Sequence, residues 1–209
     1  MWKKALLIGS LAVGVLTGQG YVDPRTGRLL LTHTDLVLPA GAINLEVSRT
    51  LVNKPAEAGL LGPGWVLNWE VSLLRVGSSA VIDEPAGISY FSQGVGGVEY
   101  TSAAGEKLVF GQDESAVRTR GDGTREGFDR QGRLVRRDYL NGNIVTLRYS
   151  ARGRLSRLEG PKGACLNFTT APGGLLTGIE TSSGVRLEYS YTGDRLVAAA
   201  LNGRPFVRY

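Results

Sequence analysis

The chain has 209 residues, of which 42% are apolar and 21% are charged, a balance that excludes a disordered chain and suits one large or two small domains. The formal net charge of +5 makes it mildly basic, and its single cysteine, Cys165, excludes an intrachain disulfide. The 30 glycines, without a collagen-like triplet, predict many tight turns between short strands. We expect Cys165 to be a small core residue on an alternating strand.

The first 20 residues have the three parts of a secretory signal peptide. Lys3 and Lys4 form a short basic region, residues 5–16 form an uncharged apolar run, and the small residues Gly18 and Gly20 precede Tyr21. The apolar run is shorter than the roughly 20 residues of an ordinary membrane span. We therefore expect a signal peptide over 1–20 and export to the periplasm, the cell surface or the medium, with membrane contact only through this segment. The alternatives are a buried helix or an uncleaved anchor.

Residues 21–110 predict a β-domain of short, irregular strands. Residues 43–51 alternate apolar and polar side chains, and a Gly/Pro-rich corner at 59–65 separates them from another strand over 66–76. No segment after residue 20 has a sustained 3.6-residue apolar period, so we expect the exported chain to be almost wholly β. Further strands are expected at 28–38, 87–91 and 107–110.

Residues 111–209 contain a repeat with a period of 21 residues. Strands with a period of two, such as 145–149 and 185–189, are separated by loops that close on glycine, as hairpins do when the last turn residue needs a positive φ. We expect each repeat to be a two-strand hairpin that buries its apolar face by stacking on its neighbours. After Tyr191 the register slips by one residue, so Leu196 occupies the expected position 197. The repeat is carried by one column of Phe128, Tyr149, Thr170 and Tyr191, a second of Gly132, Gly153 and Gly174, a third of Leu134, Leu155 and Leu176, and a fourth of Gly121, Gly142, Gly163 and Gly184.

Side chains that could support catalysis are sparse. A Ser-His-Asp or Cys-His site needs a histidine as base, and the sequence has only His33, on a predicted strand and with no Gly-x-Ser-x-Gly elbow in the chain. One histidine and one cysteine do not make a typical zinc site. The paired acids Asp83-Glu84 and Asp113-Glu114 are expected on turns with their side chains pointing apart, and the glycine-rich residues 94–97 on a flexible turn. We expect no enzymatic activity, no catalytic or metal-binding residue and no cofactor.

Two further groups of residues admit a binding interpretation. Eleven arginines crowd residues 118–157, but base-stacking aromatics are not interleaved with them. We therefore expect solvated arginines on strands and do not expect nucleic acid binding. Large aromatics could form an exposed sugar platform, but they are more often core residues, which we expect here. These aromatics are Trp65, Trp69, Tyr90, Phe91 and Tyr100.

The two halves resemble consecutive pieces of the RHS/YD-repeat family. The repeat half has an aromatic residue, Asp, two variable residues and Gly-Arg-Leu at 128–134, then Asn141-Gly142-Asn143 and later Gly153-Arg154-Leu155. The later repeats depart from this pattern, since Ser150, Ala171 and Thr192 replace the Asp and Thr170 replaces one aromatic. The opening half resembles the domain that begins many members through Val22-Asp23, Thr26-Gly27, Thr34-Asp35-Leu36, Leu38-Pro39, Arg49, Gly59-Leu60-Leu61-Gly62 and Gly64-Trp65.

The resemblance implies a strip of β-sheet that spirals into a hollow shell around a C-terminal toxin or other cargo, which this chain does not contain. The aspartyl self-cleavage segment of such proteins is not found, and Asp23-Pro24 resembles that site only superficially, at the wrong end of the chain. The expected partners are the remainder of an RHS shell or its cargo, with self-association through exposed strand edges.

The sequence thus predicts an all-β fold in which an N-terminal β-domain is followed by 21-residue hairpin repeats that form a curved sheet, part of a β-shell. The predicted function is a non-enzymatic structural segment, in which Trp65 anchors the opening domain to the repeats. In the repeats, the glycines of the second column shape the turns and the leucines of the third column form the buried face. The alternative is an exported cell-surface binding module that recognises a glycan or a protein.

Overall fold

The computed structural model describes residues 19–22, 29–52 and 59–209, and within these ranges the chain is almost wholly β. One short 3-10 turn, Pro161–Gly163, interrupts the strands. No helix among these residues is long and apolar enough to cross a membrane. The all-β prediction is confirmed. Most of the predicted signal peptide and the Asp23-Pro24 pair lie outside the described residues.

A small sheet is built from the first four strands. It contains β1 (Gln19–Val22), β2 (Leu29–Ala40), β3 (Ile43–Leu51) and β4 (Trp65–Leu67), in that order. β2 and β3 form the longest hairpin, in which the register shifts between Thr34 and Leu36. Asp35 is therefore the extra residue of a β-bulge, which re-aims its side chain.

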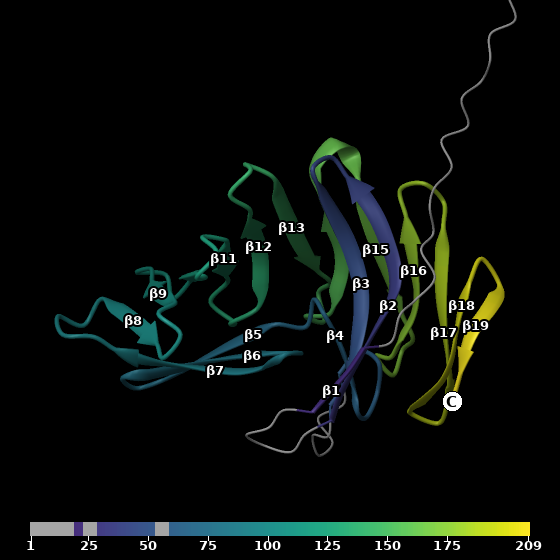
Figure 1. Cartoon of the computed structure of the whole chain (residues 1–209), viewed down its shortest axis with the longest axis horizontal. Coiled ribbons are helices and arrows are strands. Elements are labelled where there is room, and N and C mark those ends of the chain that lie inside the picture. Colours follow the sequence, from purple (N-terminus) through teal and green to yellow (C-terminus); the bar gives the residue numbers. More distant parts are fainter. Residues whose placement is uncertain (1–18, 23–28, 53–58) are drawn as a thin grey trace, which may run out of the picture.

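The other strands form one open sheet of fifteen strands, in which each strand pairs antiparallel with the next along the chain. Figure 1 shows it as a curved strip that runs from β5–β7 to β17–β19. The curved sheet of hairpins that the sequence predicts is confirmed. The strands are β5 (Ser72–Val76), β6 (Ser79–Glu84), β7 (Gly87–Gln93), β8 (Glu99–Ser102), β9 (Lys107–Phe110), β10 (Ala116–Thr119), β11 (Arg125–Phe128), β12 (Leu134–Asp138), β13 (Ile144–Tyr149), β14 (Leu155–Glu159), β15 (Cys165–Thr170), β16 (Leu176–Thr181), β17 (Arg186–Thr192), β18 (Arg195–Leu201) and β19 (Arg204–Arg208).

The prediction of one strand over 66–76 is wrong, because β4 and β5 belong to different sheets. Between them the chain turns at residues 68–71, where Glu70 accepts a hydrogen bond from the backbone N–H of Leu67 at 2.7 Å. Trp69 donates its indole N–H to the carbonyl of Glu46 at 2.7 Å. Residues 66–76 therefore lead the chain from the small sheet into the strip. β9 and β10, which lie on either side of the turn at residues 111–115, pair antiparallel from Ala116↔Phe110 to Thr119↔Lys107.

The repeat turns have the geometry that the glycine column predicts. Gly132, Gly153 and Gly174 have φ values of 74°, 74° and 98°. A bulge precedes each turn at the same place, between residues 127/128, 148/149 and 169/170. A bulge absorbs one residue, so an odd repeat of 21 residues keeps the same side chains on the same face of the sheet.

The fourth glycine column begins at a different residue from the one predicted. Gly142, Gly163 and Gly184 have positive φ values, but Gly121 does not, and Gly123 has a φ of 81° instead. Gly123 donates its N–H to the carbonyl of Arg120 at 2.9 Å, as Gly142 does to Tyr139 at 2.9 Å. The turn before β11 thus lies two residues later than the 21-residue period predicts.

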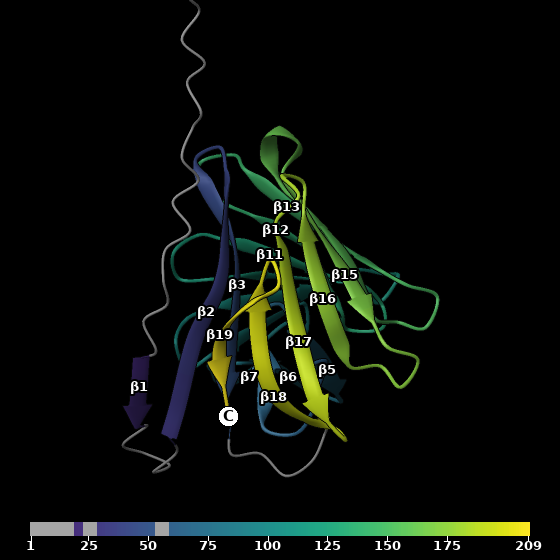
Figure 2. The ribbon, with the colours of Figure 1, turned by 90° about the vertical axis from the view of Figure 1, so that its right-hand side faces the viewer.

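One hydrophobic core joins the two sheets. Figures 1 and 2 show the β2–β3 hairpin lying against one face of the strip. Leu45 and Val47 of the hairpin are fully buried, and Gly160 of the strip leaves room for the Leu45 side chain. Leu134, Leu155 and Leu176 are buried in the same cluster, which confirms them as the inner face of the repeats.

Candidate functional site

A buried polar junction connects the small sheet to the far end of the strip. Arg49 on β3 donates its Nε–H to Oδ2 of Asp35 at 2.7 Å, and both side chains are fully buried. The hydroxyl of Tyr189 on β17 donates to the same carboxylate oxygen at 2.7 Å. A second guanidinium nitrogen of Arg49 donates to the hydroxyl of Tyr209.

Aromatic rings close this junction. The Trp65 ring centroid lies 5.3 Å from that of Tyr209 and 6.1 Å from that of His33. The guanidinium carbon of Arg49 lies 4.9 Å from the Trp65 centroid, within the range of a cation–π contact. Trp65 therefore contacts residues of both sheets, as expected of an anchor between the opening domain and the strip.

The charges of the junction are fixed by burial and pairing. Burial alone would lower the pKa of Arg49, but the hydrogen bond and the charge of Asp35 outweigh it and raise that pKa. Burial, followed by the negative charge of Asp35, raises the pKa of Tyr189 well above its usual value. Burial, together with the charge of Arg49, lowers the pKa of His33, so its ring is neutral at neutral pH. Oδ1 of Asp35 and Nη2 of Arg49 are buried without a hydrogen-bond partner among the described residues. The remaining bonds of the pair join β2, β3 and β17, which supports a structural tie.

A second polar cluster surrounds Arg118 inside the curve of β5–β11. Its guanidinium group, 1% exposed, lies 3.1 Å from Glu84, 2.7 Å from Glu106 and 3.2 Å from Glu126. Arg120 and Arg137 add contacts to the same carboxylates, at 2.9 Å to Glu84 and 2.8 Å to Glu126 respectively. Three arginines thus balance three glutamates. Since β6 and β10 are not neighbours in the sheet, the cluster ties strands that meet only because the strip curves.

This cluster corrects two predictions. The sequence predicts Asp83-Glu84 on a turn, but both residues end strand β6, and Glu84 points to Arg118 and Arg120. The arginines of 118–157 are predicted to be solvated, but Arg118 is fully buried. A signal was present in the sequence, because Arg118 and Glu126 are each two residues from a buried apolar residue, Ala116 and Phe128, on alternating strands.

A groove of about 520 Å³ lies between the corner before β5 and two repeat turns. Three of its polar side chains, Glu70, Tyr149 and Arg133, have partners within the protein. Both carboxylate oxygens of Glu70 accept backbone N–H groups, from Leu60 at 2.8 Å and Leu67 at 2.7 Å. Tyr149 donates its hydroxyl to the carbonyl of Leu134 at 2.7 Å, and Arg133 is paired with Asp129. Burial raises the pKa of Glu70 despite the two N–H groups that it accepts. Two other bonds hold this part of the chain against the repeats: the backbone N–H of Leu176 donates to the carbonyl of Leu60 at 2.7 Å, and that of Leu73 donates to the carbonyl of Gly132 at 2.8 Å.

The other residues that the sequence singled out have ordinary structural positions. Trp65, Trp69, Phe91 and Tyr100 are buried, as is Cys165, whereas Tyr90 is 68% exposed. Asp113-Glu114 and residues 94–97 lie outside the strands, as expected of turns. Within residues 19–22, 29–52 and 59–209, no group of three or more His, Cys, Asp or Glu side chains is placed to hold a metal ion.

A protein-family model matches residues 19–91, which make up less than half of the chain. Its description is a domain of unknown function, DUF6531. The matched segment contains the small sheet, the corner and the first strands of the strip, and the match is consistent with an RHS-like family.

Among solved structures, a chain in the crystal structure of TcdB2-TccC3-Cdc42 aligns with 90% of this chain at 11% identity and a TM-score of 0.34. The alignment covers 13% of that much longer chain. No curated protein matches the sequence.

Proposed function

We propose that the chain is a non-enzymatic wall segment of an exported shell of the RHS/YD-repeat type, which encloses or presents a toxin or other cargo supplied by another segment. One observation carries the proposal. The strip is an open, curved sheet in which hairpins of one geometry follow one another, and its first strand, β5, binds back at Ser72 and Leu73 to the repeat turn at Arg133 and Gly132. Such a sheet is a wall that more strands can extend.

The two polar clusters support a wall because each one joins parts of the chain that are distant in sequence. Asp35 and Tyr189 are 154 residues apart, and Arg118 and Glu84 are 34 apart. Buried charges are costly unless they are paired, and in both clusters arginines pair with carboxylates. Only Oδ1 of Asp35 and Nη2 of Arg49 are buried without a hydrogen-bond partner among the described residues. Pairs that join distant parts of the chain in this way hold its shape.

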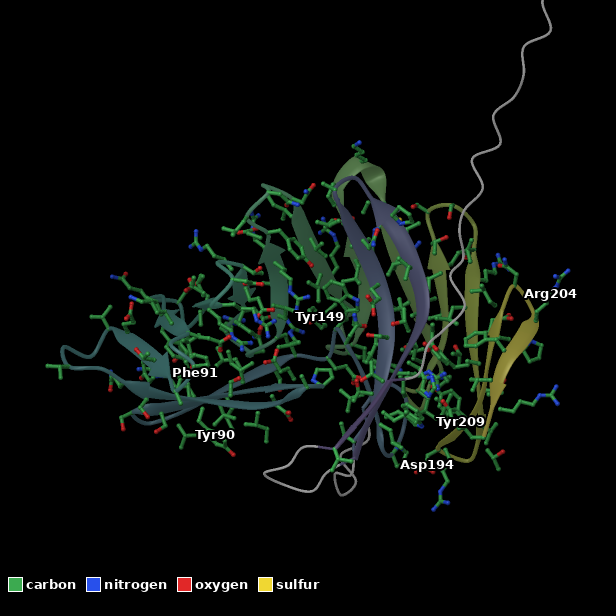
Figure 3. The ribbon with its side chains drawn as sticks, in the orientation of Figure 1. Tyr90, Phe91, Tyr149, Asp194, Arg204 and Tyr209 are labelled. Atoms are coloured by element: carbon green, nitrogen blue, oxygen red, sulfur yellow. The ribbon has the colours of Figure 1, made fainter. Side chains whose placement is uncertain are left out.

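The outer face of the strip supports assembly with further protein. Figure 3 shows Tyr90 on one side of β7 and Phe91 on the other. Phe91 is buried, whereas Tyr90 is 68% exposed, and Leu74 and Val76 on β5 are each 62% exposed. Exposed apolar side chains gathered at one end of a sheet mark an interaction surface.

A glycan array probed with the chain from the exported fraction separates a wall segment from a surface-binding module. The chain is expected in the exported fraction with an intact mass that starts at Tyr21, and it should bind no glycan selectively. Selective glycan binding that is lost on Tyr90→Ala would contradict the proposal and favour the binding module. If the whole chain stayed inside the cell, the export part of the proposal would be contradicted, but the wall part would not.

A further inference from the structure

We propose that the hollow between the repeat turns at 150–154 and 171–175 binds an aromatic side chain and a neighbouring carboxylate of another polypeptide. Such a ligand supplies to Arg154 the two kinds of partner that Arg133 has within the chain. The inference goes beyond the proposed function and does not depend on it, because the hollow is the same in a wall segment and in a surface-binding module.

Arg133 shows the complete arrangement. It ends the turn at 129–133, and its Nη2 atom lies 2.6 Å from Oδ2 of Asp129, the first residue of the same turn. Its guanidinium carbon lies 4.7 Å from the ring centroid of Tyr149, the aromatic residue of the next repeat, within the range of a cation–π contact. One carboxylate and one ring thus engage this arginine together.

Arg154 occupies the equivalent position 21 residues later but lacks both partners. Ser150 replaces the acidic residue of the turn, and Thr170 replaces the aromatic residue of the next repeat. Arg154 donates from Nη1 to the carbonyl of Gly174 at 2.5 Å, and it forms no ion pair among the residues that the structure describes. A guanidinium group carries five N–H donors, so most of its hydrogen-bonding capacity is left for a ligand.

The hollow lies where the two missing groups would be. It has a volume of about 480 Å³, and Ser150, Arg154 and Thr170 line it together with Arg152, which is exposed. Two of its seven lining residues are arginines and none is acidic, so the hollow favours an anion. The other lining residues offer apolar surface to a ring, and they are Ala151, Ala171 and Pro172.

The Arg154 side chain is fixed before any ligand binds. A Cβ at Gly174 would lie only 1.6 Å from a guanidinium nitrogen of Arg154, so the absence of a side chain lets the guanidinium group lie against this turn. The two turns belong to the neighbouring hairpins β13–β14 and β15–β16 of the strip (Figure 1). A binding group that is already in position loses less conformational freedom on binding.

The arrangement around Arg133 indicates which ligand fits. A polypeptide segment with an aromatic residue next to an acidic one carries both missing groups. Its ring would lie over Arg154 as Tyr149 lies over Arg133, and its carboxylate would accept guanidinium N–H groups as Asp129 does. The charge-assisted hydrogen bonds and the cation–π contact act together, so a segment with both groups should bind more tightly than a segment with one.

Isothermal titration calorimetry of a chain that comprises residues 21–209 tests the proposal with three peptides that are blocked at both ends. Their sequences are Gly-Tyr-Asp-Gly, Gly-Tyr-Asn-Gly and Gly-Ala-Asp-Gly. The first peptide should bind at least tenfold more tightly than the other two, with an affinity that falls as salt rises. Equal binding of the first and third peptides would show charge attraction alone and would overturn the proposal, as would binding of none of the three.

Two variants test whether the peptide binds in the hollow. Arg154→Gln should weaken binding of the first peptide at least tenfold. Ser150→Asp/Thr170→Tyr should fill the hollow from within the chain and weaken binding to a similar degree. The matched control is Arg130→Gln, which removes an exposed arginine from the preceding turn, outside the hollow, and should leave the affinity unchanged. Undiminished binding to the filled variant would overturn the proposal, because the peptide would then lie elsewhere.

Discussion

Tyr149 and Tyr191 lie two repeats apart and make the same hydrogen bond. The hydroxyl of Tyr149 donates to the carbonyl of Leu134, and that of Tyr191 to the carbonyl of Leu176, each at 2.7 Å and each over 15 residues. Burial raises the pKa of both hydroxyls, so they stay protonated donors at neutral pH. Two of the four residues of the aromatic column are therefore clamps between successive hairpins.

Removing one clamp should cost stability without changing the fold. Tyr149→Phe and Tyr191→Phe each delete one hydroxyl and leave a leucine carbonyl without its donor, at a cost of about 1 kcal/mol. Urea unfolding of each variant measures the loss, and Tyr90→Phe, at an exposed tyrosine, serves as the control. An unchanged midpoint for both clamp variants would show that the hydroxyls do not hold the repeats.

Thr170 occupies the clamp position in the repeat between them, where no clamp is made. Thr170 and Arg154 line an open hollow beside the turn at 150–154, much as Tyr149 and Arg133 line the groove one repeat earlier. Thr170→Tyr should fill this hollow and donate to the carbonyl of Leu155, raising stability by about 0.5–1.5 kcal/mol. Thr170→Phe fills the space without the donor, so an equal gain from both variants would refute the hydrogen bond as the cause.

Two glycines with the same φ should differ in what a methyl group costs. Gly132 and Gly153 both have a φ of 74°, and alanine there costs roughly 1–2 kcal/mol. The backbone N–H of Leu73 on β5 donates to the carbonyl of Gly132 at 2.8 Å, so β5 lies close to this turn. A Cβ added at Gly132 would therefore also collide with the carbonyl of Leu73. A Cβ added at Gly153 would have its nearest neighbouring atom 3.6 Å away. Thermal unfolding should therefore show a larger loss for Gly132→Ala than for Gly153→Ala. Equal losses of stability in the two variants would mean that β5 moves away from the new Cβ at no cost in free energy.

Arg118→Met should be severely destabilising at neutral pH. It leaves Glu84, Glu106 and Glu126 without their fully buried cation and with only the more exposed Arg120 and Arg137 beside them. Removing one partner of a buried pair typically costs about 3–5 kcal/mol. Arg148→Met, which breaks an exposed pair with Glu159, should cost below about 1 kcal/mol. Urea unfolding of the two variants at neutral pH checks the difference.

The same pair of variants predicts a pH dependence. Burial would raise the pKa of Glu84, but Arg118 outweighs burial and lowers it. A carboxylate with a lowered pKa stabilises the folded state above its usual pKa of 4.5, and this contribution is lost as the pH falls through the folded-state value. Without Arg118, the glutamates of the cluster destabilise the folded state most when they are ionised. The difference in the free energy of unfolding between wild type and Arg118→Met should therefore become smaller as the pH falls from about 7 to about 4. A difference in the free energy of unfolding that grew on acidification would contradict this electrostatic account.

The sequence was sufficient for features whose cause is local. The turn glycines at 132, 153 and 174 have the positive φ values that their loops require, and Leu134 and its equivalents are buried because a period of two fixes their face. Tertiary contacts escaped prediction. Asp35 meets Tyr189 only because the small sheet lies against the strip, and Arg118 meets Glu84 only because the strip curves. The spacing places Arg118 on the same face as the buried Ala116, but it does not identify Glu84 as its partner. No spacing links Asp35 to Tyr189.

The proposed wall is tested most directly by light scattering after size exclusion of a chain that comprises residues 21–209, over a range of concentrations. An open strip with an exposed apolar face on β5–β7 should form species larger than a monomer, and their share should rise with concentration. A clean monomer at every concentration would mean that the chain needs no further wall, and it would contradict the proposed function.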